Sequence, residues 1–105
     1  MQAPEWHDRP LGGTGRRVTP LGLGGAWLGR TQNGLDEAVG IATVRRALDL
    51  GLTVVDTSAG YLGGRSEAII GKALRSWLRE GGCREDLVIS TKTGTRKWRD
   101  RDYTA

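Results

Sequence analysis

Apolar positions fall into two patterns that alternate through most of the chain. Residues 36–50 and 67–80 carry apolar side chains at helical spacing, and glycine follows each stretch, as it commonly does at the end of a helix. Two continuous apolar runs, residues 52–56 and 87–91, come after these stretches and predict strands. The first run stays apolar until Asp56, as expected for a strand that is buried on both faces of a parallel sheet.

Each predicted helix has a polar residue at its start. Asp36 can accept a hydrogen bond from the first turn, and Glu37 adds negative charge where the helix dipole favours it. Ser66 and Glu67 have the same arrangement before the second helix. We therefore expect Asp36 and Ser66 to be the N-cap residues.

The segments before the first helix predict shorter elements. Residues 1–8 are typical of a loose leader, so we expect the domain to comprise residues 9–105. Residues 9–19 surround a glycine-rich turn and predict a β-hairpin. Residues 20–25 predict a short strand, and residues 26–35 predict a loop.

The resulting order is hairpin, strand, helix, strand, helix, strand. Right-handed crossovers make the three main strands parallel neighbours. An open doubly wound sheet and a (β/α)8 barrel both begin this way, and both place their chemistry at the C-terminal ends of the strands. The dinucleotide fingerprint of the open sheet needs a third glycine after Gly22 and Gly24, where this chain has Trp27. The glycine spacing therefore favours the barrel.

Composition narrows the function classes. The chain has 105 residues, a formal net charge of +4 and one cysteine, Cys83, which predicts neither a disulfide framework nor a multi-cysteine zinc site. We expect no metal. The N-terminus lacks the pattern of a secretory signal, and no apolar stretch reaches the roughly 20 residues that span a bilayer. Asp100 interrupts the basic cluster at residues 96–101 and Asp102 follows it, so we expect no nucleic-acid partner. These features favour a soluble cytoplasmic protein.

Three polar residues suggest chemistry. Asp56 and Lys92 end consecutive predicted parallel strands, and Tyr61 lies in the loop after the first. A carbonyl that is reduced by hydride transfer needs a positioned acid, and a phenol can supply the proton. A neighbouring ammonium ion favours the phenolate form, and a carboxylate keeps the amine charged and aimed. The trio therefore indicates carbonyl reduction, although Asp56 and Lys92, each taken alone, are more typical of a structural role, and Tyr61 alone fits packing equally well.

Several motifs in register resemble the aldo-keto reductase family. They are Arg9-Pro10-Leu11-Gly12, Leu21-Gly22-Leu23-Gly24-Gly25, Asp56-Thr57-Ser58 with Tyr61, Gly64-Arg65-Ser66-Glu67, and Ser90-Thr91-Lys92. The resemblance covers about residues 9–105. It implies an N-terminal hairpin followed by the first three β/α units of a (β/α)8 barrel, an α/β fold, and an NADP(H)-dependent oxidoreductase. The implied substrate is a small carbonyl compound or a sugar.

The resemblance also assigns roles to residues. It implies that Tyr61 is the general acid, that Lys92 assists the departure of its proton, and that Asp56 supports Lys92. The loop of Gly24, Gly25 and Ala26 is expected to lie along the cofactor, with Asp56 beside it. Trp27 is expected either to wall the substrate pocket or simply to pack against the barrel rim.

Three departures from the family pattern shape the expectation. The chain has Leu62 where the family has glycine after the tyrosine, and leucine is strained if that site needs a positive φ. The family's fourth catalytic residue, a histidine, has no match, because His7 lies in the leader. A barrel of this type needs about 250 residues. We therefore expect the N-terminal portion of a reductase, inactive alone, or else a non-catalytic module that pairs with a complementary barrel fragment.

Overall fold

A computed structural model describes residues 4–93, and it begins with the predicted hairpin. Strands β1 (Arg9–Pro10) and β2 (Arg17–Val18) are antiparallel. Before them, the half-buried Trp6 donates its indole N–H to the carbonyl oxygen of Leu50 at 2.8 Å, which departs from the loose leader expected there. The predicted basic cluster at residues 96–101 lies outside the described residues.

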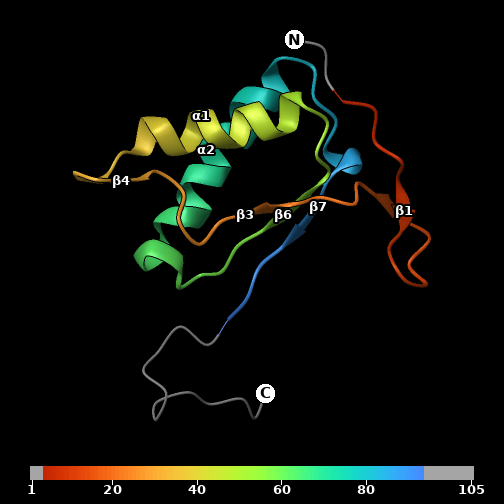
Figure 1. Ribbon diagram of the computed structural model, residues 1–105, viewed down its shortest axis with the longest axis horizontal. Helices are drawn as coiled ribbons and strands as arrows, with labels where there is room; N and C mark the ends of the chain where they lie inside the picture. Colours follow the sequence, from red (N-terminus) through yellow and green to blue (C-terminus); the bar gives the residue numbers. More distant parts are fainter. Residues whose placement is uncertain (1–3, 94–105) are drawn as a thin grey trace.

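A parallel sheet of three strands follows in the order β3–β6–β7. These strands are β3 (Leu23–Gly24), β6 (Val54–Asp56) and β7 (Val88–Ser90). Asp56 pairs with Gly24 on one side and with Ser90 on the other, so the C-terminal ends of the three strands lie together at the same end of the sheet (Figure 1). The predicted neighbouring parallel strands are confirmed.

Two helices connect these strands, and both end at glycine as predicted. In α1 (Glu37–Asp49), the carboxylate of Asp36 accepts a hydrogen bond from the amide of Val39, so the first N-cap prediction is confirmed. In α2 (Arg65–Arg79), the N-cap prediction for Ser66 is wrong. Gly64 takes the cap position with φ +94°, and Ser66 lies inside the helix with its hydroxyl turned into the protein.

The segment predicted as a loop at residues 26–35 contains a second hairpin. Strands β4 (Arg30–Thr31) and β5 (Gly34–Leu35) are antiparallel, so the loop prediction is wrong there. Thr31 pairs with Gly34, so Gln32 and Asn33 form the turn, and the left-handed backbone lies at Gly34, which has φ +109°. The hydroxyl of Thr31 adds a hydrogen bond to the carbonyl oxygen of Gly34 at 3.0 Å.

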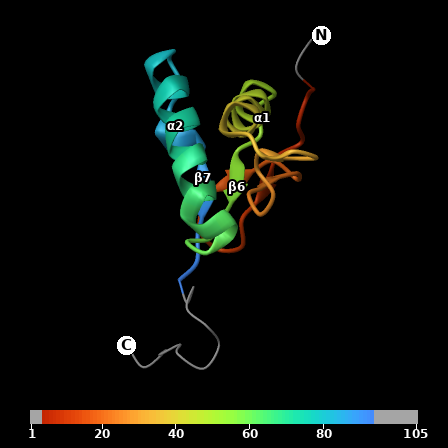
Figure 2. The ribbon, with the colours of Figure 1, turned by 90° about the vertical axis from the view of Figure 1, so that its left-hand side faces the viewer.

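Both helices pack against each other and cover one side of the sheet (Figures 1 and 2). The core between these layers is made of apolar side chains from both helices and the strands: Leu28, Val44, Leu48, Val55, Ile69, Ile70, Ala73 and Leu87. Val55 is fully buried, whereas Val54, which points to the opposite face, is half-buried. Within the described residues, the strand is therefore fully buried only on the helix side.

Two short 3-10 helices complete the described chain. They are η1 (Tyr61–Gly64), between β6 and α2, and η2 (Arg84–Asp86), before β7. Among residues 4–93, no helix is both long enough and apolar enough to cross a membrane.

Candidate functional site

The strand ends bring Asp56 and Lys92 together. Pairing between the chain segments continues past β6 and β7, since the amide of Thr57 donates to the carbonyl oxygen of Ser90 at 2.8 Å. The amide of Ala59 then donates to the carbonyl oxygen of Lys92 at 3.2 Å. These two backbone bonds fix Lys92 beside the loop that follows Asp56.

Lys92 is the centre of the predicted trio. Its ammonium nitrogen, Nζ, lies 2.9 Å and 3.0 Å from the two carboxylate oxygens of Asp56. The same nitrogen lies 2.7 Å from the carbonyl oxygen of Thr57 and 3.2 Å from the phenol oxygen of Tyr61. The structure thus brings Asp56, Tyr61 and Lys92 into one hydrogen-bonded cluster.

The charge of Lys92 is stabilised by this cluster. The hydrogen bond to Asp56 is the largest cause that raises the pKa of Lys92 above its ordinary value, and the contact with Tyr61 acts in the same direction. Partial desolvation acts against both. The side chains of Lys92 and Asp56 are each 45% exposed, so water and salt reach the ion pair and screen it.

The loop that carries Tyr61 has an unusual backbone. Leu62 has φ +54° and ψ +34°, and it is the one non-glycine residue with positive φ in the part of the chain that the structure describes. The expected strain at Leu62 is therefore present, at a cost of about 1–2 kcal/mol for a residue with a Cβ in this region. Its side chain packs against the core, which anchors the loop directly after Tyr61.

A buried hydroxyl network joins this loop to the one after β3. The hydroxyl of Ser66 donates to the carbonyl oxygen of Gly25 at 2.7 Å and lies 2.8 Å from the hydroxyl of Thr57. The amide of Gly25 donates to the carbonyl oxygen of Asp56 at 2.7 Å. The sequence predicted only an N-cap role for Ser66, from its residue type and its position before the helix. The contacts of its hydroxyl with Gly25 and Thr57 were therefore missed.

The loop predicted to line the cofactor lies at the same strand ends. Gly24 is exposed, Gly25 is buried and Ala26 is half-buried. Gly24 and Asp56 are direct partners in the register of β3 and β6, so this loop borders the trio.

Trp27 stands apart from this cluster. Its side chain is 70% exposed, and the guanidinium carbon of Arg30 lies 5.5 Å from its ring centroid. Among residues 4–93, its one described aromatic or cation–π contact is with Arg30 rather than with the trio. Its predicted place beside a substrate stays a prediction.

No group of three or more metal-ligating His, Cys, Asp or Glu side chains occurs among residues 4–93. The site at the strand ends therefore consists, in the described part, of an ion pair, a phenol and open backbone.

The sequence model of the aldo/keto reductase family matches residues 20–105. This chain belongs to the aldo/keto reductase family. The aldo-keto reductase YhdN of Bacillus subtilis is 41% identical over 81 residues, which is 76% of this chain and 23% of YhdN. The NADH-specific methylglyoxal reductase of Escherichia coli is 38% identical over 89 residues, covering 81% of this chain and 26% of that enzyme.

A solved structure agrees with the family assignment. The holo form of an aldo-keto reductase from Bacillus halodurans superposes with a TM-score of 0.71 and 31% identity, covering 93% of this chain and 29% of that one. The neighbours are TIM barrels, and this chain forms an α/β segment of that fold. It spans about a quarter of the length of the curated reductases it matches.

Proposed function

We propose that this chain carries the catalytic tyrosine, lysine and aspartate of an NADP(H)-dependent reductase that acts on aldehydes, ketones or aldoses. The observation that carries the proposal is the position of Lys92, whose Nζ contacts both oxygens of Asp56 and the phenol oxygen of Tyr61. A structural ion pair needs only the carboxylate, and the added contact with the phenol favours a role in proton transfer.

Each residue of the trio has a distinct task in this reaction. NADP(H), when bound, supplies or accepts the hydride at the carbonyl carbon. As the carbonyl π electrons move to oxygen, that oxygen takes the phenolic proton of Tyr61. The ammonium group of Lys92, 3.2 Å from the phenol oxygen, stabilises the phenolate that remains. Asp56 holds Lys92 charged and oriented, and the reverse proton transfer serves the oxidation of an alcohol.

We propose that the loop of Gly24, Gly25 and Ala26 would lie along the cofactor. A Cβ built on Gly24 would meet no atom within 4 Å, so its backbone faces open space. A Cβ built on Gly25 would lie 2.7 Å from the hydroxyl of Ser66 and 2.9 Å from the carbonyl oxygen of Asp56. The backbone at Gly25 can therefore sit close to Asp56 only because glycine has no side chain.

We further propose that this chain requires the rest of the barrel for activity. Lys92 and Asp56 are each 45% exposed, so bulk water screens the ion pair that would stabilise the phenolate of Tyr61. Enclosed sites strengthen these electrostatic interactions by excluding water. The whole enzyme's substrate and cofactor preference depend on loops beyond this segment.

A second candidate function is a non-catalytic module that pairs with a complementary barrel fragment. The observation that favours it is the exposed apolar surface beside α1, where Val39 is 45% exposed and Leu21 is 56% exposed. Both functions predict binding to a barrel remainder, but only the first predicts turnover afterwards.

A chimera separates the two functions. Residues 9–93 of this chain would replace the matching segment of the Bacillus halodurans reductase, and NADPH and NADH oxidation would be measured with methylglyoxal, an aromatic aldehyde and an aldose. We expect activity that falls about 10²–10⁴-fold in the Tyr61→Phe variant. A folded chimera without activity would favour the non-catalytic module, and turnover that survives Tyr61→Phe would exclude the assigned proton donor.

A further inference from the structure

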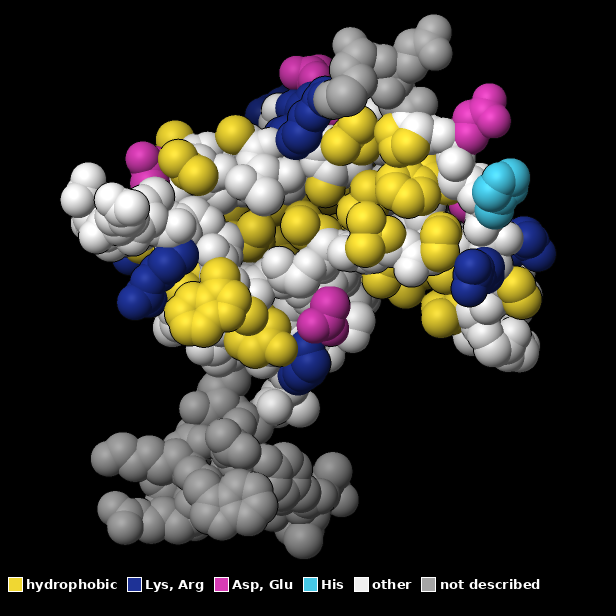
Figure 3. Space-filling model, viewed as in Figure 1, with side chains coloured by type: hydrophobic (Ala, Val, Ile, Leu, Met, Phe, Trp, Pro, Cys, Tyr) yellow, Lys and Arg dark blue, Asp and Glu magenta, His cyan; other side chains and the backbone are white. Residues whose placement is uncertain are grey.

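The turn that follows the loop of Gly24, Gly25 and Ala26 presents a tryptophan and an arginine together. Trp27 is 70% exposed, and the guanidinium carbon of Arg30 lies 5.5 Å from the centroid of its indole ring. Figure 3 shows an exposed hydrophobic patch with Lys or Arg side chains beside it at the left of the molecule, where Figure 1 draws β4. Neither Trp27 nor Arg30 has a task in the proposed proton transfer.

The backbone of this turn is fixed by its contacts. Leu28, between the two exposed residues, is only 4% exposed and belongs to the core. The amide of Arg30 donates to the carbonyl oxygen of Trp27 at 3.1 Å, and the amide of Asp36 donates to the carbonyl oxygen of Gly29 at 2.8 Å. Gly29 has φ +77°, and a Cβ there would lie 2.4 Å from the carbonyl oxygen of Asp36. The turn therefore holds Trp27 and Arg30 at the surface on either side of a buried anchor.

Arg30 carries a charge that is available to a ligand. No carboxylate among residues 4–93 forms an ion pair with it, whereas Lys92 pairs with Asp56 and Lys72 pairs with Glu37. An aromatic ring attracts a guanidinium group without accepting its N–H donors as a carboxylate does, so these donors can serve an anion. A guanidinium group that is already restrained also loses less side-chain entropy on binding.

The turn starts at the end of the sheet that carries the trio. Gly24 pairs with Asp56, and Trp27 follows three residues later. Lys92 lies at this end of the sheet as well, since its Nζ contacts both carboxylate oxygens of Asp56. The turn and the trio therefore border the same end of the sheet.

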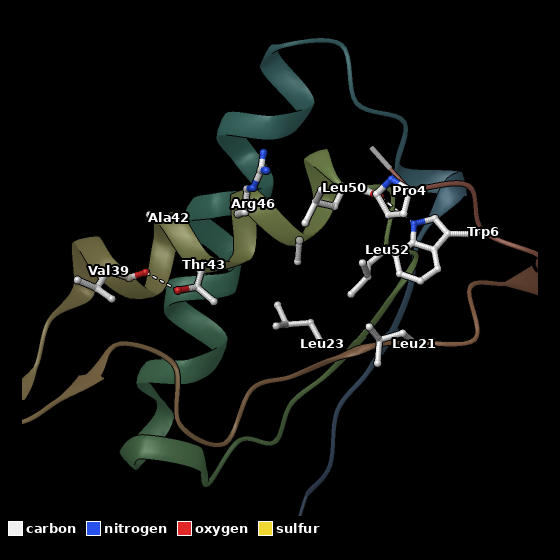
Figure 4. A pocket seen from close by; sticks show the side chains of 11 residues that line it. Pro4, Trp6, Leu21, Leu23, Val39, Ala42, Thr43, Arg46, Leu50 and Leu52 are labelled. Carbon is white, nitrogen blue, oxygen red and sulfur yellow. Dashed lines mark hydrogen bonds between the residues drawn. The ribbon is translucent and has the colours of Figure 1, made fainter. Parts of the chain in front are cut away.

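An apolar groove of about 640 Å³ beside α1 is a separate surface (Figure 4). Its lining includes Trp6 and also Leu21 and Leu52, which precede β3 and β6. The groove therefore lies toward the N-terminal ends of the strands, and neither Trp27 nor Arg30 is among its lining residues. A ligand in the groove would contact Trp6 rather than Trp27, which gives a test an internal reference.

We propose that Arg30, restrained by Trp27, is a specificity-determining residue that selects carbonyl substrates carrying a carboxylate group. This inference rests on the proposed reductase function and adds the class of its substrate. With the carbonyl oxygen at Tyr61, the carboxylate accepts hydrogen bonds from the guanidinium group of Arg30. The net charge of +4 also favours the approach of an anion.

Arg65, at the start of α2, is the competing cation. Like Arg30, it has no ion-pair partner among residues 4–93. Unlike Arg30, it has no cation–π contact within that range. The restraint by Trp27 therefore favours Arg30 as the anion-binding residue.

The chimera that tests the proposed function also tests this inference. We would measure kcat/KM for 4-carboxybenzaldehyde with 4-methylbenzaldehyde, and for succinic semialdehyde with butanal. The two pairs differ in the distance between carbonyl and carboxylate. We expect Arg30→Met to lower kcat/KM about five- to tenfold for at least one of the two acids, and to leave the neutral partners within about twofold. The loss should lie mainly in KM, because the contact is the same in the bound substrate and the transition state.

Matched variants separate this contact from a general effect of charge. Arg30→Lys keeps the charge and should retain part of the preference for the acid. Arg65→Met and Arg9→Met remove the same charge elsewhere and should change the ratio of acid to neutral substrate by less than about twofold. Circular dichroism confirms that each variant folds.

NMR of the 105-residue chain tests the anion site without catalysis. The nitrogen-15-labelled chain would be titrated with benzoate and with benzamide, which has the same ring without the charge. The Trp27→Phe variant identifies the indole signal of Trp27. We expect benzoate to shift this signal to saturation, benzamide to shift it little, and Arg30→Met to abolish the response to benzoate.

Each other result counts against the proposal. Turnover without any loss of acid preference in Arg30→Met would overturn it, and an equal loss in Arg65→Met would assign the anion to Arg65. A benzoate response at Trp6 rather than Trp27 would place the anion in the groove. If the chimera reduces no aldehyde, the proposed function fails, and the NMR titration then decides alone whether Arg30 binds a carboxylate.

Discussion

The hydroxyl of Ser66 donates a hydrogen bond to the carbonyl oxygen of Gly25 at 2.7 Å, across 41 residues of sequence. The Ser66 side chain is fully buried at the start of α2, and Gly25 belongs to the loop that follows β3. This bond holds the proposed cofactor loop against the start of α2, directly after the η1 segment that carries Tyr61. A helix residue thereby fixes the distance between two loops of the site.

We expect Ser66→Ala to destabilise the protein by about 1–3 kcal/mol, because the carbonyl oxygen of Gly25 loses its buried donor and the hydroxyl of Thr57 loses its partner. Urea unfolding followed by circular dichroism measures the change in the free energy of unfolding. Ser90→Ala, at an exposed site, is the control and should stay within about 0.5 kcal/mol of wild type. Equal small effects at both serines would contradict a structural role for the network.

Gly25 and Gly24 form a matched pair for a second prediction. We expect Gly25→Ala to cost about 1–3 kcal/mol, because its Cβ would collide with the hydroxyl of Ser66 and with backbone at Asp56. Gly24→Ala should be far milder, since its Cβ would meet nothing within 4 Å. Thermal melts of the two variants check the order, and a milder effect at Gly25 would show that the two loops can separate without cost.

Much of this fold is predictable from local pattern. Apolar side chains at helical spacing predicted the two helices, two continuous apolar runs predicted β6 and β7, and the glycine after each helix marked its end. The N-cap at Asp36 also followed from a local rule, because its carboxylate bonds an amide only three residues away. The sequence also predicted that Asp56 and Lys92 lie close together, because neighbouring parallel strands have their C-terminal ends at the same end of the sheet.

Long-range contacts account for what the sequence did not reveal. Ser66 has the residue type and position of an N-cap, and only the fold shows that Gly25 lies within reach of its hydroxyl. The β4–β5 hairpin is a different case. Its turn at Gln32 and Asn33 is local, but the strands are two residues long and carry no alternating pattern that would reveal them.

Leu62 permits a prediction on backbone strain. We expect Leu62→Gly to be more stable than Leu62→Ala by about 1 kcal/mol, which is the reverse of the usual preference for alanine at helical positions. Both variants lose the packing of the leucine side chain, but only glycine adopts φ +54° freely. Chemical denaturation of both variants under one set of conditions measures the difference. If alanine proves the more stable, the loop does not keep its positive φ in solution.

Lys92 permits a prediction on pH. Since Asp56 is the main cause that raises the pKa of Lys92, we expect Asp56→Asn to lower the titration midpoint of its ammonium group. NMR of the side-chain nitrogen with selective labelling reads this midpoint directly. Glu67→Gln, whose carboxylate accepts from Thr91 rather than from Lys92, is the control and should leave the midpoint nearly unchanged.

The same shift fixes how stability depends on pH. The folded-state pKa of Lys92 is raised above the ordinary value of 10.5, so the stabilising contribution is complete below about pH 10.5 and is lost as pH rises through the folded pKa. The difference in unfolding free energy between wild type and Asp56→Asn should therefore be constant with respect to Lys92 near neutrality and shrink in strong alkali. Urea unfolding at a series of pH values measures it. A difference that grows with alkaline pH would mean that the ion pair does not stabilise the charged lysine in the folded chain.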